Sequence, residues 1–125
     1  MSEVTIQVSF TQLTTDDDFV LDQLTEELAD DLRDIGDVQR VERPQRDPDT
    51  KGVAELVLGT VTVLAGTDPA YAAALVDLVV GFLNRNTGRS AQLKVGDIEF
   101  KIDKPTAREV ADLISVVRDA VERYR

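Results

Sequence analysis

Apolar residues occupy every second position from Val4 to Phe10, with polar residues between them. This alternation is typical of a strand with one buried face. Aliphatic residues then recur every three or four positions, behind an acidic stretch from Asp16 to Asp18 that can cap a helix. They are Leu21, Leu24, Leu28, Leu32 and Ile35. Their spacing predicts an amphipathic helix that Gly36 ends.

The apolar middle of the chain contains an ambiguous segment, Val53 to Gly66. The run Val61-Thr62-Val63 favours a strand, whereas the residues around Leu56 favour a helix. We expect a buried helix here, although the residues leave open whether Val53–Leu64 is helix or strand. Ala70 to Asn84 is a clearer helix, with Thr67-Asp68-Pro69 as its capping sequence.

The flanking segments have simpler patterns. Val38 to Arg43 is a weak strand candidate that Pro44 ends, and a polar loop follows as far as Gly52. Ala91 to Val95 and Ile98 to Ile102 alternate on either side of Gly96-Asp97, which predicts a β-hairpin.

The last predicted element is a helix that begins at a capping box. Thr106 and Glu109 have the spacing of that motif, and apolar positions from Val110 to Tyr124 trace one helical face. The predicted order is β-α-β-α(α)-β-β-α. It indicates one α+β domain over residues 1–125, a single sheet with a C-terminal β-hairpin packed by three or four helices.

The composition excludes several classes of protein. The chain has 125 residues, 42% of them hydrophobic, which suits one globular domain. Leu56–Thr67, the longest uncharged run of the apolar middle, is shorter than the roughly 20 residues of a membrane-spanning helix. The first ten residues contain no apolar core of a signal peptide, so we expect a cytoplasmic protein.

Cysteine and histidine are both absent, which removes thiolate nucleophiles, histidine bases and the usual zinc ligands. Neither Asp16-Asp17-Asp18 nor Asp47-Pro48-Asp49 has the spacing of a calcium-binding loop. We therefore expect a non-enzymatic protein without cofactor or metal. The alternative from the residues is a small carboxylate-based hydrolase or metal-dependent enzyme, because 24 acidic residues offer many carboxylate pairs.

Acidic residues concentrate on the first predicted helix. Between Asp16 and Asp37 there are ten acids and one base, Arg33, so this segment holds −9 of the net charge of −10. Such a surface can steer a basic partner protein, or it can simply improve solubility. The candidate partner-docking residues are Asp22, Glu26, Glu27, Asp30, Asp31 and Asp34.

Two weaker signals concern other partners. Arg85, Arg89, Lys94 and Lys101 could form a small positive patch near the hairpin, but with few aromatic residues beside it we expect no nucleic-acid binding. The apolar stretch Val53–Leu83 contains several small residues, and part of it could face a second copy of the chain. We expect no contact with membranes.

The layout of the chain resembles the first type of the effector-associated constant component family of bacterial conflict systems. The matching features are the β-α-β opening, the loop Arg43–Pro48, the glycine-led apolar stretch Gly52–Gly59, the alanine-rich helix Ala70–Arg85 and a charged hairpin. This chain departs from the family pattern at Val61-Thr62-Val63, which replaces a small-residue break, and its hairpin is less basic.

The resemblance implies a non-enzymatic adaptor of bacterial antiviral defence. Members of that family are encoded beside variable effectors such as peptidases, and they are thought to couple sensing to effector action. The resemblance transfers no catalytic residues to this chain. We accordingly expect a protein-protein interaction module whose partner is a peptidase-type or other effector.

Overall fold

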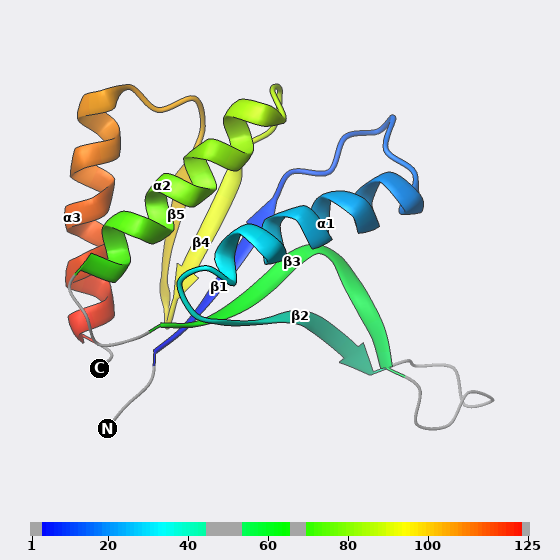
Figure 1. Cartoon of the computed structure of the whole chain (residues 1–125), viewed down its shortest axis with the longest axis horizontal. Coiled ribbons are helices and arrows are strands. Elements are labelled where there is room, and N and C mark those ends of the chain that lie inside the picture. The colour runs from blue at the N-terminus through cyan, green and yellow to red at the C-terminus, as the bar shows by residue number, and fades with distance from the viewer. Residues whose placement is uncertain (1–3, 45–53, 66–69, 124–125) are drawn as a thin grey trace.

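The computed structural model describes residues 4–44, 54–65 and 70–123, which form five strands and three helices (Figure 1). In chain order these are β1 (Val4–Phe10), α1 (Asp18–Leu32), β2 (Asp37–Pro44), β3 (Ala54–Ala65), α2 (Ala70–Arg85), β4 (Ala91–Val95), β5 (Ile98–Ile102) and α3 (Ala107–Arg123). The α+β class is confirmed, and so is the C-terminal hairpin of β4 and β5.

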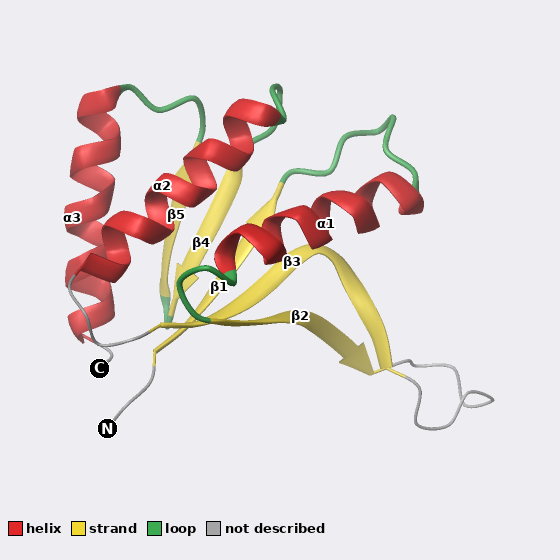
Figure 2. Cartoon of the chain, viewed as in Figure 1, coloured by secondary structure: helices red, strands yellow, loops and turns green. Residues whose placement is uncertain are grey.

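The strands form one antiparallel sheet in the order β2-β3-β1-β4-β5. β3 lies between β1 and β2, and β1 lies between β3 and β4, so the first six elements make two interlocked split β-α-β units. β5 extends the sheet at the β4 end. The helices lie on one side of the sheet, with α2 in contact with both α1 and α3 (Figure 2).

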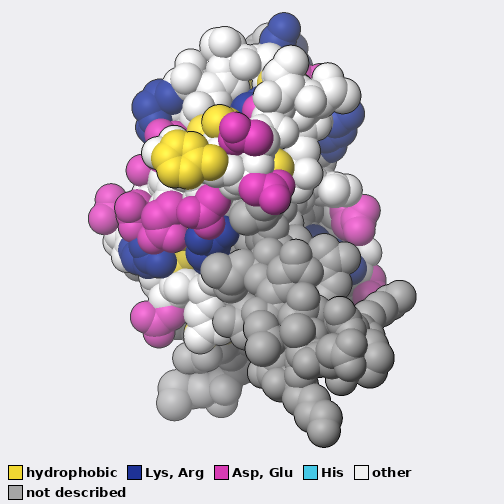
Figure 3. Space-filling model, turned by 90° about the vertical axis from the view of Figure 1, so that its right-hand side faces the viewer, with side chains coloured by type: hydrophobic (Ala, Val, Ile, Leu, Met, Phe, Trp, Pro, Cys, Tyr) yellow, Lys and Arg dark blue, Asp and Glu magenta, His cyan; other side chains and the backbone are white. Residues whose placement is uncertain are grey.

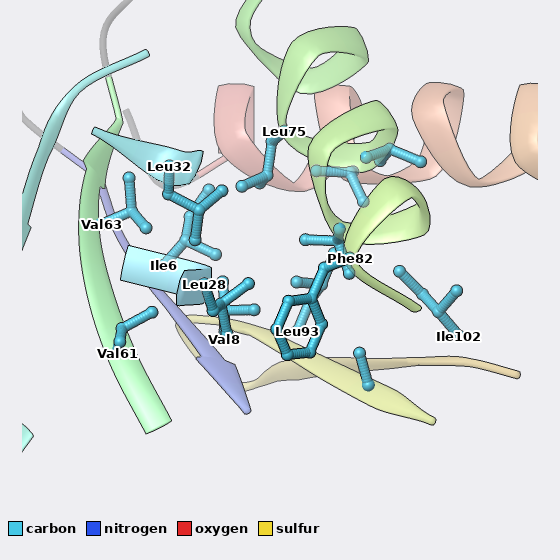
Figure 4. Packing of buried hydrophobic residues seen from close by; sticks show 14 of the residues in the cluster. Ile6, Val8, Leu28, Leu32, Val61, Val63, Leu75, Phe82, Leu93 and Ile102 are labelled. Carbon is cyan, nitrogen blue, oxygen red and sulfur yellow. The ribbon is translucent and has the colours of Figure 1, made fainter. Parts of the chain in front are cut away.

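The core fills the space between the helices and one face of the sheet. Alternate residues of β1, β3 and β4 point into it, because successive side chains of a strand point to opposite faces. Leucines of α1 and a Leu and Phe of α2 close it from above (Figure 4). Its fully buried members include Ile6, Val8, Leu28, Leu32, Val61, Val63, Leu75, Phe82 and Leu93.

The expectation of a helix in the middle of the chain is wrong. Residues 54–65 form the strand β3, so the element order is β-α-β-β-α-β-β-α. The segment pairs with β1 on one side and with β2 on the other, which satisfies its backbone groups without a helix. Consecutive apolar residues from Leu56 to Leu58 precede the alternating Val61 and Val63, which made the period of the segment ambiguous in sequence.

Gly59 marks the place where β3 bends. Its φ is +83°, a conformation that glycine adopts at little cost, and β1 pairs only with the residues after it. The β2–β3 register also shifts between Arg40 and Glu42. The amide of Gly59 donates to the hydroxyl of Thr25 at 2.7 Å, and that hydroxyl donates to the carbonyl of Leu21 at 2.6 Å. The fully buried Thr25 thereby joins α1 to the bend.

The remaining elements follow the predictions closely. β1, β2, α2, the turn near Gly96 and α3 are confirmed. α1 ends at Leu32, so Ile35 lies after the helix instead of on it. Thr106 and Glu109 form the expected capping box, with the Glu109 amide 3.2 Å from the Thr106 hydroxyl. The predicted cap at residues 67–69 lies outside the described residues.

Candidate interaction surface

The side of α1 that faces away from the core carries Phe19, Gln23, Glu26 and Asp30. These residues are spaced three or four positions apart, which places them on one helical face. The opposite face holds Leu21, Leu28 and Leu32, which are buried. The helix is capped by Asp17, whose carboxylate accepts from the Val20 amide at 2.8 Å. We call Phe19, Gln23, Glu26 and Asp30 the α1 outer face.

Arginines from β2 and from the end of α1 neutralise one flank of the helix. Arg40 lies opposite Val61 in the sheet, hence on the helix-covered side, and its guanidinium is 2.7 Å from Asp22 and 3.8 Å from Glu26. Its side chain is only 14% exposed. Arg33 is 3.0 Å from Glu26 and also pairs with Asp30, and the hydrogen bond to Glu26 is the main cause of its raised pKa.

The other flank is neutralised from α2. Arg85 pairs with Asp31 and lies 3.6 Å from Glu27. The side-chain amide of Asn86 donates to Glu27 at 2.9 Å. Asp34 pairs with no cation among the described residues. Five of the six predicted docking residues are therefore held in intramolecular ion pairs, and three arginines reduce the net charge of the six from −6 to −3.

These pairs change the meaning of the acidic helix. In the sequence, α1 is a run of acidic residues with one base. In the fold, arginines pair with most of its half-exposed carboxylates and hold them in place. Exposed ion pairs add little stability, typically below about 1 kcal/mol each. The arginines instead orient the carboxylates. The surface therefore stays negatively charged, and its side chains are held in fixed positions.

Three exposed apolar residues lie at the start of α1, and the sequence-based site missed them. Phe19 is 68% exposed, while Leu13 is 37% and Val20 is 36% exposed. Figure 3, which faces the end of the molecule where α1 begins, shows an apolar patch bordered by a band of acidic side chains. Phe19 does not fit the leucine spacing that marks the buried stripe. That misfit is the sequence signal that could have found it.

A buried ion pair fixes the loop before α1, which carries Leu13. Arg89 makes two bonds of 2.7 Å to the two carboxylate oxygens of Asp16, and these side chains are only 8% and 6% exposed. Arg89 also donates to the carbonyl of Thr11 at 2.9 Å and lies over the ring of Phe10. The bond from Arg89, with the amide of Leu13, lowers the pKa of Asp16 to about 2.

The four basic residues that could have formed a small positive patch near the hairpin do not lie together. Arg85 and Arg89 are turned towards acidic residues of α1 and of the loop before it, as described above. Lys94 and Lys101 lie on the exposed face of the sheet, away from the helices, and Phe82 is in the core. The four basic residues are therefore divided between two sides of the molecule.

Two features of the described residues bear on the alternative of a carboxylate-based or metal-dependent enzyme. No three acidic side chains gather there as a metal site would require, and Asp47 and Asp49 lie outside those residues. An open hollow of about 310 Å³ lies beside the ends of β1 and β4. Its polar lining comes from Ser9, Thr11, Ser90, Gln92 and Lys101, and no carboxylate lines it.

Part of the apolar stretch Val53–Leu83 could have faced a second copy, and the members whose side chains are described are mostly core. Val61, Leu75 and Val79 are buried, and none of the strongly exposed large apolar side chains among the described residues belongs to the stretch. Within the described parts of the chain, no helix is long and apolar enough to cross a membrane. No family model, curated protein sequence or solved structure matches this chain, and the resemblance to the effector-associated family stays a prediction.

Proposed function

We propose that this chain is a non-enzymatic protein-interaction module that binds a basic partner protein through the α1 outer face and the residues beside it. The observation that carries the proposal is Phe19, a large aromatic side chain 68% exposed at the edge of an ordered acidic surface. Exposed aromatic residues are costly to leave in water and often dominate protein interfaces.

The chemistry of the surface defines the partner that fits it. Phe19, with Val20 and Leu13, requires an apolar pocket. The carboxylates of the next turns, Asp22 and Glu26, require Lys or Arg at the rim of that pocket, and Asp34 adds negative charge beyond the far end of the helix. Charges at a rim act chiefly on the association rate, whereas a buried aromatic acts on dissociation. An effector of a bacterial conflict system, as the family resemblance implies, is the class of partner that we propose.

The test begins with a photo-crosslinking residue at Gln23, in the middle of the α1 outer face. Proteins that crosslink in the native source are identified, purified and titrated against the unmodified chain. Phe19→Ser should then weaken binding at least about 30-fold, which corresponds to roughly 2 kcal/mol for a dominant interface residue. The matched control is Val116→Ser, which changes an apolar residue that is 46% exposed on α3.

Measured association and dissociation rates separate the contribution of the acidic residues from that of Phe19. Asp34→Asn removes a charge with no described cationic partner, so it should slow association and reduce the salt dependence without changing the fold. Equal weakening by Phe19→Ser and Val116→Ser, or binding that neither variant affects, would contradict the proposal.

A further inference from the structure

The two edges of the sheet are built differently. β2, at one edge, contains a register shift between Arg40 and Glu42 and ends in Pro44. Bulges and prolines are features by which natural sheets prevent edge-to-edge pairing. β5, at the other edge, has neither, and it pairs with β4 in one continuous register over Ile98–Ile102. Among the described strands none pairs with its outer side.

The register of the hairpin determines which backbone groups face this free edge. Val95 pairs with Ile98 across the two-residue turn, and such flanking residues form a hydrogen-bonded pair. Hydrogen-bonded and non-hydrogen-bonded pairs alternate along an antiparallel ladder. The backbone groups of Ile98, Phe100 and Ile102 therefore face β4. Those of Glu99 and Lys101 face outward.

The side chains of β5 that point towards the helices are also less covered than those of β4. Ala91, Leu93 and Val95 are all buried, whereas Ile98 and Phe100 are only half-buried and Ile102 alone is buried. An additional strand beside β5 would cover these two apolar residues. α3 packs on α2 and β4 and leaves them incompletely covered.

We propose that two copies of this chain pair through β5 in antiparallel orientation, with the two-fold axis at Phe100. The sequence Ile-Glu-Phe-Lys-Ile is complementary to itself when reversed about that residue. Glu99 of each copy lies opposite Lys101 of the other, in two hydrogen-bonded pairs that also bring opposite charges together. The two Phe100 rings meet on the axis, under the helix layer. The sheet then continues through both copies.

The charges select this register over its neighbours. If the axis moves to Glu99 or to Lys101, two like charges face each other at the centre of the contact, which is destabilising. If instead the register shifts so that Glu99 lies opposite Phe100 of the other copy, outward-facing backbone groups of one strand lie opposite residues whose own groups face β4. The outward-facing groups are then left without hydrogen-bond partners. The proposal is independent of the α1 outer face, because α1 packs over β2 and β3, towards the opposite edge of the sheet.

The first test measures mass by light scattering over a dilution series. The unmodified chain should give the mass of a dimer that dissociates on dilution. Glu99→Lys and Lys101→Glu should each be monomeric, because every cross-strand pair then joins like charges. Mixing these two variants should restore a dimer of one copy of each, since every introduced charge then faces an opposite one. The double variant carrying both changes should dimerise by itself.

The second test uses the absence of cysteine from the chain. Phe100→Cys places one thiol of each copy at the axis, in a non-hydrogen-bonded pair with Cα atoms about 4.5 Å apart, a separation that a disulfide can bridge. Ile98→Cys is the matched control, also half-buried. Its two copies would be offset by four residues, roughly 13 Å along the strands. Phe100→Cys should crosslink on mild oxidation and Ile98→Cys should not.

Circular dichroism shows whether each variant is folded. The mixing experiment is also its own control, because it recovers a dimer from two variants that are monomeric alone. A monomer at every concentration overturns the proposal. So does a dimer that persists in Glu99→Lys and Lys101→Glu, which places the contact elsewhere. Equal crosslinking of the two cysteine variants also overturns it.

Discussion

Helices α1 and α3 lie on either side of α2, and they are attached to the rest of the molecule in different ways. α1 buries residues along its whole length, from Leu21 to Leu32, and receives arginines from both neighbouring elements. α3 buries only Val117, Ala120 and Val121, all in its second half. Its one ion pair among the described residues, Arg118 with Asp119, spans 4.0 Å within the helix itself.

The comparison shows that a regular apolar stripe in the sequence of a helix does not determine how deeply that helix is buried in the fold. α3 has the cleaner stripe in sequence, yet Val110, Leu113 and Ile114 of that stripe are only half-buried. α1 has an unfavourable accumulation of like charge, yet it is the more firmly held helix. The elements beneath a helix decide how deeply its apolar face is buried: α1 packs on α2 and on the strands β2 and β3, whereas α3 packs mainly on α2 and only lightly on β4.

The largest expected effect is on the core contacts of the two helices. Leu28→Ala should lower the free energy of unfolding by about 3–4 kcal/mol, because it removes a fully buried side chain between α1 and the sheet. Val117→Ala should cost about 2 kcal/mol, since it removes two carbon atoms where Leu28→Ala removes three. Urea denaturation measures both. A larger loss for Val117→Ala would reverse the comparison.

A buried polar contact fastens α1 but has no described counterpart in α3. Thr25→Val should cost about 1–3 kcal/mol, because the amide of Gly59 loses its acceptor inside the protein. Amide hydrogen exchange at Gly59 should become faster at the same time. Thr25→Ser keeps the hydroxyl and should keep that protection, even though it loses a methyl group. Unchanged exchange in Thr25→Val would show that this bond does not hold the bend.

The arginines that pair with α1 are expected to contribute less. Arg40→Met should lower stability by about 0.5–1 kcal/mol, because Asp22 and Glu26 lose their shared cation. Arg118→Met in α3 should change stability by less than about 0.5 kcal/mol. The difference should shrink in high salt, which screens the exposed carboxylates. Equal effects of the two substitutions would remove the electrostatic part of the comparison.

The same pairs alter the expected effect of neutralising the helix. From the sequence alone, changing Glu26, Glu27, Asp30 and Asp31 to amides should relieve repulsion and leave the fold as stable or more so. In the structure those four residues pair with three arginines, and the largely buried Arg40 keeps only its closer partner Asp22 when they are changed. We therefore expect this fourfold variant to be less stable than the unmodified chain, as thermal unfolding would measure.

The contribution of the Asp16–Arg89 pair should be visible in the dependence of stability on pH. Asp16 has a folded pKa of about 2, below the value of about 3.9 for an unfolded chain. Its stabilising contribution is thus complete above pH 4 and is lost as pH falls from about 4 to 2. Asp16→Asn should be less stable near neutral pH and should lose less stability over that acid range. Glu109→Gln, at the cap of α3, is the control. An unchanged acid slope in Asp16→Asn would contradict the assignment.

Several elements could be predicted because their causes are local in sequence. The alternation in β1, the two-residue turn of the hairpin and the capping box at Thr106 each depend on residues two to four positions apart. The leucine stripe of α1 belongs to the same class, and the buried stripe implied which residues of that helix face outward. Even Phe19 could have been recognised as exposed, because it lies off the stripe.

Tertiary structure alone decided the remainder. The segment 54–65 is a strand because β1 and β2 lie on its two sides and accept its hydrogen bonds, and no pattern within the segment records those neighbours. The charge of α1 is moderated by Arg40 and by Arg85, which is 54 residues from its partner Asp31. Short-range patterns fix which face of an element is apolar. What that face and its flanks touch depends on contacts between residues far apart in the chain, which form only when the whole sheet has assembled.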